Sequence, residues 1–358
     1  MILVECPLNS LSFGNVSLNI LRELFKEKKQ VALFPIGENH DLSAYNLEQD
    51  FQDWISNSLS SKWKNWHQDM PSLKLWHLMG SENRKSRNQT LYTFYECSEP
   101  TEIERAVASN QARTIFSSSY ARDKFQAYGI DCHFIPLGFD PDFKQITVPR
   151  PENTVQFGLM GKFEHRKHTS KIIKSWLKRY GNNPAFNLNL CVTNPFFKPE
   201  DMNAILAACF DGVHYNNVNI LPYLKTNEDV NGFLNFIDID LGGLSGAEGW
   251  NLPSFNATCL GKWSVVLNAT SHKDWANSDN SVLVEPSSTI EAHDAIFFKK
   301  GSPFNQGVFF DWSEEDFNNA MDIVETKVGQ INAAGVKLSQ QLTYKNMVSQ
   351  LLSGLETD

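Results

Sequence analysis

The chain of 358 residues is too long for one ordinary hydrophobic core and fits two domains of roughly 150 to 200 residues each. Hydrophobic residues make up 41% and charged residues 20%, a composition typical of folded globular proteins rather than of disordered or fibrous ones. The net charge of -9 argues against a surface devoted to nucleic-acid backbones, because such surfaces depend on clustered Lys and Arg.

Short apolar runs alternate with amphipathic stretches along the chain. In the first part, apolar runs predict strands at 1–6, 31–37, 73–79, 91–96, 113–118 and 133–138. Val16, Ile20 and Leu24 recur between the first two runs at helical spacing. The polar stretch 145–154, with two prolines, is the predicted linker.

The second part repeats this alternation. Strands are expected at 155–161, 188–193, 218–224, 236–243, 263–269 and 281–286, and helices at 169–180, 200–210, 228–235, 252–261, 314–328 and 338–355. Strands joined by crossover helices are typical of parallel sheets. The chain is therefore expected to be an α/β protein with two Rossmann-like domains, 1–148 and 149–336, facing a cleft, and a C-terminal helix, 337–358, that can cross back to the first domain.

The location of the protein is also predicted from the sequence. The chain begins with an apolar strand rather than a basic leader, and no apolar run approaches the 18 or so residues needed to span a membrane. Its six cysteines are scattered, without a spacing typical of metal ligands, and are interpreted as reduced thiols. We expect a cytoplasmic protein with no stable membrane insertion.

The most specific segment runs from Gly246 to Asn256, with the sequence Gly-Ala-Glu-Gly-Trp-Asn-Leu-Pro-Ser-Phe-Asn, and lies between a predicted strand and a predicted helix. A glycine turn that leads into a helix offers free backbone N–H groups to a diphosphate. Glu248 cannot favour an anion, so we expect it to accept hydrogen bonds from sugar hydroxyls. The turn residues expected at the donor are Gly249, Trp250, Asn251 and Leu252.

This segment resembles that of the large retaining glycosyltransferase family that includes glycogen synthase, sucrose synthase and bacterial mannosyltransferases. In that family a Glu-Gly-Phe-Gly-Leu-Pro segment ends in a second Glu, where this chain has Asn256. The resemblance implies the GT-B fold and a nucleoside-diphosphate sugar as co-substrate. It also implies retention of configuration, without a metal ion or a bound cofactor.

Three further segments occur in the order that the resemblance requires. Gly161 to Lys167 is similar to the family's Gly-Arg-x-x-x-x-Lys segment, which implies that Lys162 and Lys167 hold the donor diphosphate. The stretch 135–143 resembles a Pro-x-Gly-Val-Asp turn that closes the first domain, and its role is expected to be architectural. Near the N-terminus, Gly14 is expected in a loop close to the donor phosphates, although a plain loop explains one glycine nearly as well.

One feature of the sequence departs from the family's pattern, and a second resembles a motif of a different glycosyltransferase fold. Where the family often has a histidine, this chain has Tyr95 followed by Glu96. Glu96 either polarises an acceptor hydroxyl, orients the sugar or caps the next helix. The pair Asp238 and Asp240 imitates a metal-binding Asp-x-Asp motif, but it lies within a predicted strand and is interpreted as structural. We expect no metal site.

The acceptor is left open by the sequence. A stretch of cations and aromatics, from Lys62 to Trp66 and from Lys74 to Arg87, is the place where acceptor contacts are expected, although a solvated face explains it as well. The acceptor is a carbohydrate, a small molecule or DNA. The alternatives to a general glycosyltransferase are a viral-type enzyme that glycosylates hydroxymethylated bases in DNA and a catalytically inactive sugar-nucleotide binding protein.

Overall fold

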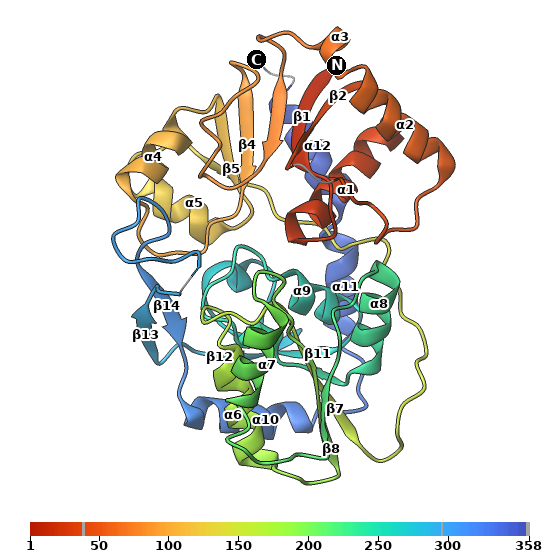
Figure 1. Cartoon of the computed structure of the whole chain (residues 1–358), viewed down its shortest axis with the longest axis vertical. Coiled ribbons are helices and arrows are strands. Elements are labelled where there is room, and N and C mark those ends of the chain that lie inside the picture. The colour runs from red at the N-terminus through yellow and green to blue at the C-terminus, as the bar shows by residue number, and fades with distance from the viewer. Residues whose placement is uncertain (38–39, 295, 356–358) are drawn as a thin grey trace. The chain divides into compact units, whose positions relative to one another are not determined.

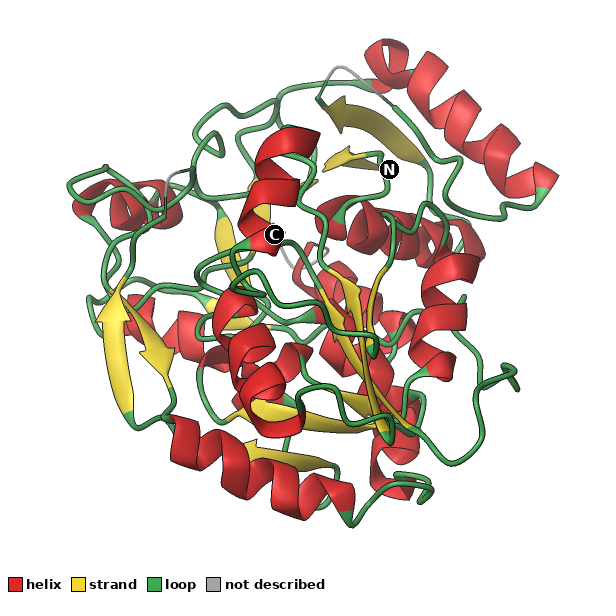
Figure 2. Cartoon of the chain, turned by 60° about the horizontal axis from the view of Figure 1, so that its bottom comes forward, coloured by secondary structure: helices red, strands yellow, loops and turns green. Residues whose placement is uncertain are grey.

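The computed structural model describes residues 1–37, 40–294 and 296–355, which form two compact units. The first unit contains residues 1–140 and 302–306 together with the chain from Leu342 onward. The second contains residues 141–301 and 307–341. Figure 1 shows a sheet with surrounding helices in each unit, and Figure 2 colours these elements by type.

The first unit is built on a parallel sheet of six strands in the order β2-β1-β3-β4-β5-β6. The strands are β1 (Ile2–Pro7), β2 (Val31–Ile36), β3 (Ser72–Leu75), β4 (Gln89–Thr93), β5 (Arg113–Phe116) and β6 (His133–Phe134). The helices are α1 (Ser12–Lys26), α2 (Gln49–Ser60), α3 (Lys62–Asn65), α4 (Glu102–Ser109), α5 (Ser119–Gln126) and α12 (Tyr344–Leu355). Every residue of β1 is buried, as expected for an inner strand covered on both faces.

The second unit has a parallel sheet in the order β9-β8-β7-β10-β11-β12. Its strands are β7 (Val155–Met160), β8 (Phe186–Cys191), β9 (Val218–Ile220), β10 (Ile239–Asp240), β11 (Trp263–Leu267) and β12 (Ser281–Val284). The α-helices are α6 (Thr169–Tyr180), α7 (Pro199–Ala207), α8 (Asn227–Phe236), α9 (Leu252–Cys259), α10 (Glu314–Glu325) and α11 (Ala333–Gln341). Trp176 and Phe317, both fully buried, belong to the core between the sheet and its helices. The two sheets confirm the predicted α/β class.

The strand orders define one special position in each sheet. In the second sheet the chain runs outward from β7 to β9 and then returns to the other side of β7 with β10. Ligands of open α/β sheets bind outside the carboxyl ends of the strands at such a switch point. The loops after β7 and β10 therefore meet where a ligand is expected, and the loops after β1 and β3 have the same relation in the first sheet.

The division between the units falls after Asp140, before the stretch 145–154 that the sequence analysis identified as the linker. Residues 141–148 are held by the second unit, because Asn231 and Asn235 of α8 accept hydrogen bonds from the backbone N–H groups of Lys144 and Ile146, at 3.0 and 3.1 Å. Gly138 is required where the first unit closes. A Cβ there would lie 2.0 Å from the Tyr344 nitrogen at the start of α12.

Several elements differ from the sequence-based expectation. The expected helix 338–355 is two helices, α11 in the second unit and α12 in the first, separated at Leu342 and Thr343. The expectation also lacks α2, α3 and an antiparallel pair formed by β13 (Ser288–Glu291) and β14 (Val308–Asp311). Within the described residues, no helix is long and apolar enough to cross a membrane.

Candidate functional site

The candidate site lies at the switch point of the second sheet. The loop after β7 carries Gly161 to Lys167, and the segment after β10 carries Gly246 to Asn251. The two segments are joined by backbone hydrogen bonds, since the Gly246 nitrogen donates to the Arg166 carbonyl at 2.8 Å. The structure thus brings together the two segments that the sequence analysis predicted to act on the donor.

A network of three cations and two carboxylates occupies this position. Arg166 bridges the carboxylates, donating through Nη2 to Glu164 Oε2 and through Nη1 to Glu248 Oε2, both at 2.8 Å. Lys167 Nζ donates to the other oxygen of Glu248, and Lys162 Nζ lies 3.0 Å from Glu164 Oε1. The cations exceed the carboxylates by one, so the cluster retains a positive charge that can attract an anion.

Burial makes these interactions strong. The side chains of Glu164, Arg166 and Glu248 are each less than 10% exposed, whereas Lys167 is 14% and Lys162 33% exposed. Burial alone would raise the pKa of Glu248, but Arg166 and Lys167 more than offset it and hold that pKa well below its ordinary value. Glu248 is therefore an anion that both segments share, and Lys162 is the most accessible of the three cations.

Two glycines allow the segments to approach. Gly161 has φ of +142°, a conformation that other residues rarely adopt, and a Cβ there would lie 3.4 Å from Lys167 Cδ. At Gly246 a Cβ would lie 2.3 Å from the Phe310 carbonyl oxygen and 2.5 Å from His168 Nε2. Any side chain at Gly246 would push apart the turn and the start of α6.

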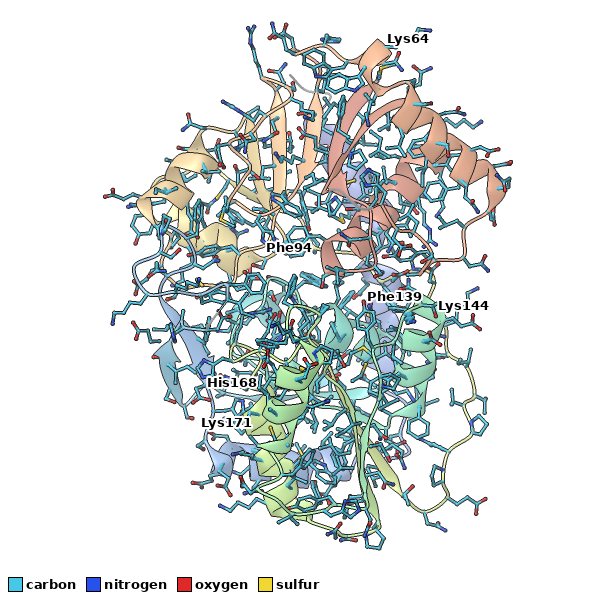
Figure 3. All side chains as sticks on the ribbon, in the orientation of Figure 1. Lys64, Phe94, Phe139, Lys144, His168 and Lys171 are labelled. Carbon is cyan, nitrogen blue, oxygen red and sulfur yellow. The ribbon has the colours of Figure 1, made fainter. Side chains whose placement is uncertain are left out.

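The amino end of α6 is anchored to β14. His168 precedes α6 in a left-handed conformation, and its Nε2 lies 2.8 Å from the Phe310 carbonyl oxygen. Lys171, one turn further along, donates to Asp311 Oδ1 at 2.6 Å. Figure 3 labels both side chains. The strand β14, which the sequence analysis missed, thus fixes the end of the loop that carries Lys162 and Lys167.

A buried histidine holds the turn before α9. Asn251 is the residue before the helix and has a left-handed φ of 69°. Its Nδ2 donates to the Gly242 carbonyl at 2.9 Å and lies 3.0 Å from His272 Nε2. His272 Nδ1 lies 2.8 Å from the Leu267 carbonyl oxygen, which places the proton on Nδ1 and leaves Nε2 to accept from Asn251. Burial lowers the pKa of His272 to about 4, so the imidazole is neutral at pH 7.

This turn leads directly into α9. Its first residues, Leu252 and Pro253, are partly buried, and the amino end of a helix carries backbone N–H groups without helical acceptors. Trp250 is buried, and its carbonyl accepts a hydrogen bond from Trp275 Nε1 at 3.0 Å. Gly249 completes the turn. Trp250 therefore packs within the turn, with its side chain buried.

Asn256 is 4% exposed, and its Oδ1 atom has no hydrogen-bond partner in the described structure. A buried polar atom without a partner costs free energy. Asn256 is in α9, one turn beyond the glycine turn. Its side-chain oxygen is therefore a buried acceptor that the described residues leave unused.

In the first unit, the predicted residues lie near the carboxyl ends of the strands. Gly14 is in the first turn of α1 and not in the expected loop. The position requires a glycine, because a Cβ there would lie 2.1 Å from the Asn9 carbonyl oxygen. Glu96 follows β4 and is partly buried. It does not cap the next helix, since Thr101 and Glu104 form the capping box of α4. Tyr95 is 2% exposed and packs edge-on against Phe125.

An aromatic cluster lies at the switch point of the first sheet. Phe13 at the start of α1 packs against Trp76, His77 and Phe94, with ring centroids 5.7, 4.4 and 4.8 Å away. Trp76 and His77 follow β3, and Phe94, labelled in Figure 3, follows β4. His77 is exposed and the other three are half-buried. The sequence analysis did not identify this cluster, because its members are distant in the chain.

Most of the basic aromatic stretch lies away from this aromatic cluster. Lys62 and Trp63 belong to α3, before β3, and Arg84 and Arg87 precede β4, so they lie at the amino ends of the strands. Lys74 is buried within β3, where it donates to the Asn83 carbonyl at 2.6 Å. These residues lie away from the carboxyl ends, where ligands of such sheets bind, whereas Trp76 of the same stretch follows β3 and belongs to the aromatic cluster.

The acidic pair has structural partners. Asp238 accepts from the Gln156 backbone at 2.9 Å and forms an ion pair with Arg150. Asp240 is buried and accepts from the Gly242 nitrogen at 3.1 Å. Among the residues that the structure describes, no group of three or more His, Cys, Asp or Glu side chains could hold a metal ion.

Sequence reasoning missed three residues of the site. Arg166 and Glu164 lie within the predicted Gly161–Lys167 segment, and their opposite charges two positions apart were the available signal. His272 gave no signal, because only the fold places it beside Asn251.

The chain was compared with known proteins. No known family model matches it, and no curated protein matches its sequence. Among solved structures, sucrose-phosphate synthase from Thermosynechococcus elongatus has a TM-score of 0.69 at 10% identity, covering 98% of this chain and 97% of the other. HepE of Anabaena in complex with UDP-glucose has a TM-score of 0.68 at 15% identity, covering 100% and 99%. Trehalose-6-phosphate synthase (OtsA) has a TM-score of 0.68 at 10% identity, with the same coverage. The chain therefore has the GT-B fold, which its resemblance to retaining glycosyltransferases implied.

Proposed function

We propose that the protein transfers a sugar from a nucleoside-diphosphate sugar to an acceptor hydroxyl, with retention of configuration and without a metal ion. The observation that carries the proposal is the cluster of Lys162, Arg166 and Lys167 around Glu248 at the switch point, beside the amino end of α9. Support for a nucleotide donor also comes from HepE, which is similar in fold and whose structure contains UDP-glucose.

The reaction breaks the bond between the anomeric carbon and the phosphate oxygen. Negative charge grows on the leaving diphosphate while positive charge develops on the sugar. Cations that are fixed in place before the reaction stabilise that leaving group without reorganisation. Lys167 is held by Glu248 and Lys162 by Glu164, so both ammonium groups are positioned in advance.

Glu248 has a second role in this proposal. Its two oxygens accept from Arg166 and Lys167, but a carboxylate has about four lone-pair sites. The remaining sites can accept hydrogen bonds from sugar hydroxyls. Retention rests on the resemblance to retaining enzymes and on trehalose-6-phosphate synthase, whose similar structure is described in a study of glycosyl transfer with retention.

The aromatic cluster of the first unit supports an acceptor with an apolar ring face, such as a carbohydrate. Three of the four cluster members, Phe13, Trp76 and Phe94, are uncharged aromatic rings, whereas binding to a polyanion such as DNA depends on clustered Lys and Arg. Glu96, which follows β4 close in sequence to Phe94, remains our candidate to polarise the acceptor hydroxyl. Within the described residues the six cysteines form no disulfide, which fits a reducing compartment such as the cytoplasm.

Asn256 offers a direct test of the donor site. We expect Asn256→Ala to weaken the binding of a nucleoside diphosphate about fivefold, because one neutral hydrogen bond to the ribose contributes about 1 kcal/mol. Calorimetric titration with UDP, in buffer containing EDTA, measures this effect.

The control for this titration is the deoxyribose nucleotide. Wild type and Asn256→Ala are each titrated with 2′-deoxy-UDP and with 3′-deoxy-UDP. One of these nucleotides lacks the hydroxyl that Asn256 binds, and for that nucleotide the two proteins should have equal affinity. Equal affinity of the two proteins for UDP itself would remove Asn256 from the donor site. UDP binding that is present without EDTA and disappears when EDTA is added would refute metal independence.

A further inference from the structure

The first unit contains a cavity that is unrelated to the candidate site. Its volume is about 410 Å³, and it is lined by residues of β5, α5 and α12 and by β6 with its two flanking residues, namely Arg113, Arg122, Gln126, Cys132, His133, Phe134, Ile135, Gln350 and Ser353. Arg113 begins β5 and His133 begins β6, so the cavity lies at the amino ends of these strands. Gly14 and Glu96 lie at the opposite ends.

The lining of the cavity is cationic. Among the described residues that line it are Arg113 and Arg122 but no carboxylate, in a chain with a net charge of -9. Outside the lining, the carboxylate of Asp123 on α5 accepts a hydrogen bond from Arg122 Nε at 2.8 Å. The Arg122 guanidinium also lies 5.9 Å from the centre of the Phe134 ring, so two contacts fix its direction.

Gly354 leaves space for the guanidinium of Arg113. A Cβ at Gly354 of α12 would lie only 1.3 Å from Arg113 Nη1, so the guanidinium occupies the space that any other residue would fill. A glycine destabilises a helix interior relative to alanine. The packing of Arg113 against Gly354 explains why α12 has a glycine at this position. The Arg113 guanidinium donates no hydrogen bond to another side chain or to a carbonyl in the described part of the chain. Its planar set of N–H donors is therefore open to a ligand.

We propose that this cavity binds the phosphate group of a phosphate monoester as an accessory site. One guanidinium group can donate two parallel hydrogen bonds to two oxygens of a phosphate. Two guanidinium groups from different elements, here Arg113 and Arg122, can therefore hold one phosphate dianion. The Gln126 Nε2 group is already bonded to the Cys132 carbonyl at 2.9 Å, which leaves its carbonyl oxygen to accept from an ester's hydroxyls. A site at the amino ends of the strands is separate from the reaction at the carboxyl ends.

The test uses glycerol 3-phosphate and inorganic phosphate as probes, titrated into the full chain and followed by ³¹P NMR. We expect saturable binding of both. Arg113→Gln should weaken it at least about tenfold, because a charge-assisted hydrogen-bond pair is lost. Arg113→Lys should fall between this variant and wild type, since it keeps the charge and loses the planar donors.

Gly354→Ala separates binding from folding. Alanine favours the helix more than glycine does, but its Cβ displaces the Arg113 guanidinium, so we expect weaker phosphate binding in a protein at least as stable. Lys124→Gln is the matched control, because it removes a cation of α5 outside the cavity lining. Binding that falls equally in Lys124→Gln and Arg113→Gln would reveal only general charge attraction and overturn the proposal.

The accessory site is also distinguishable from the proposed donor site. Lys167→Ala alters the second unit alone, so phosphate binding that survives in this variant is independent of the donor site. Loss of binding in Lys167→Ala with full retention in Arg113→Gln would place the anion at the donor site and refute the accessory one. Preference for the ester over free phosphate would identify a phosphorylated small molecule as the ligand, and equal binding would identify phosphate itself.

Discussion

Lys167→Ala is expected to lower the rate of sugar transfer by about 10² to 10³, the usual effect of removing one fixed contact to the charge that develops in a transition state. Lys167 is held against Glu248 beside Gly161, where φ of +142° brings the backbone close to the lysine side chain. The rate is measured as nucleoside diphosphate released at saturating donor. Lys162→Ala should give a loss in the same direction.

The control for Lys167→Ala is Lys174→Ala. Lys174 is a half-exposed lysine of α6, with its Nζ 3.8 Å from Asp211, so its removal changes the charge equally without touching the site. We expect its rate to equal that of wild type. If Lys167→Ala retained the wild-type rate, Lys167 would have no part in the mechanism, and an equal loss in Lys174→Ala would point to a general effect of charge.

Arg166→Gln is expected to destabilise the second unit by about 3 to 5 kcal/mol, because removing one partner from a buried ion network leaves carboxylates without their counter-charge. Arg166 is 9% exposed and bridges Glu164 and Glu248. Thermal unfolding followed by calorimetry should show a decrease in Tm on the order of 10 °C. Arg87→Gln, which breaks an exposed pair with Asp69, should change stability by less than about 1 kcal/mol. A similar Tm for both variants would contradict the bridging role.

The same network predicts how acid affects stability. Burial raises the pKa of both Glu164 and Glu248, but the cations more than offset this, so both pKa values are lower in the folded protein. A carboxyl group with a lowered pKa contributes stability above its unfolded pKa of about 4.3, and the contribution is lost as the pH falls below that value. In Arg166→Gln the pKa values of Glu164 and Glu248 are lowered less, because one cation is gone. The Tm of this variant should therefore decrease less between pH 6 and 3 than the Tm of wild type.

Much of the fold follows from local patterns. The strand β7 and the helix α6 fall within a residue of their expected bounds, since a buried apolar run and an amphipathic helix are both specified by nearby residues. The pair β13 and β14 was missed because its strands are short, and β13 is largely exposed. The break at Thr343 was also missed. It depends on the close approach of Gly138, which no local pattern encodes.

The candidate site was predictable to the extent that it resides in continuous segments. Gly161 to Lys167 and Gly246 to Asn256 were recognised by residue type and order, and the fold brings them together at one switch point. The bridging role of Arg166 was not predictable, because its partner Glu248 is far away in sequence. Gly14 was placed in a loop because a glycine after a strand is typical of one, whereas its close contact with Asn9 is a property of the folded chain.

The central claim is that the second unit activates a nucleoside-diphosphate sugar by means of its own cations. The most direct measurement is the release of nucleoside diphosphate from a panel of nucleotide sugars, in EDTA and without added acceptor, by wild type and Lys167→Ala. We expect slow release from at least one donor by wild type, and release lower by about 10² to 10³ in the variant. No release from any donor, together with no binding of UDP or of any donor in the panel, would contradict the account, while binding without release would favour an inactive sugar-nucleotide binding protein.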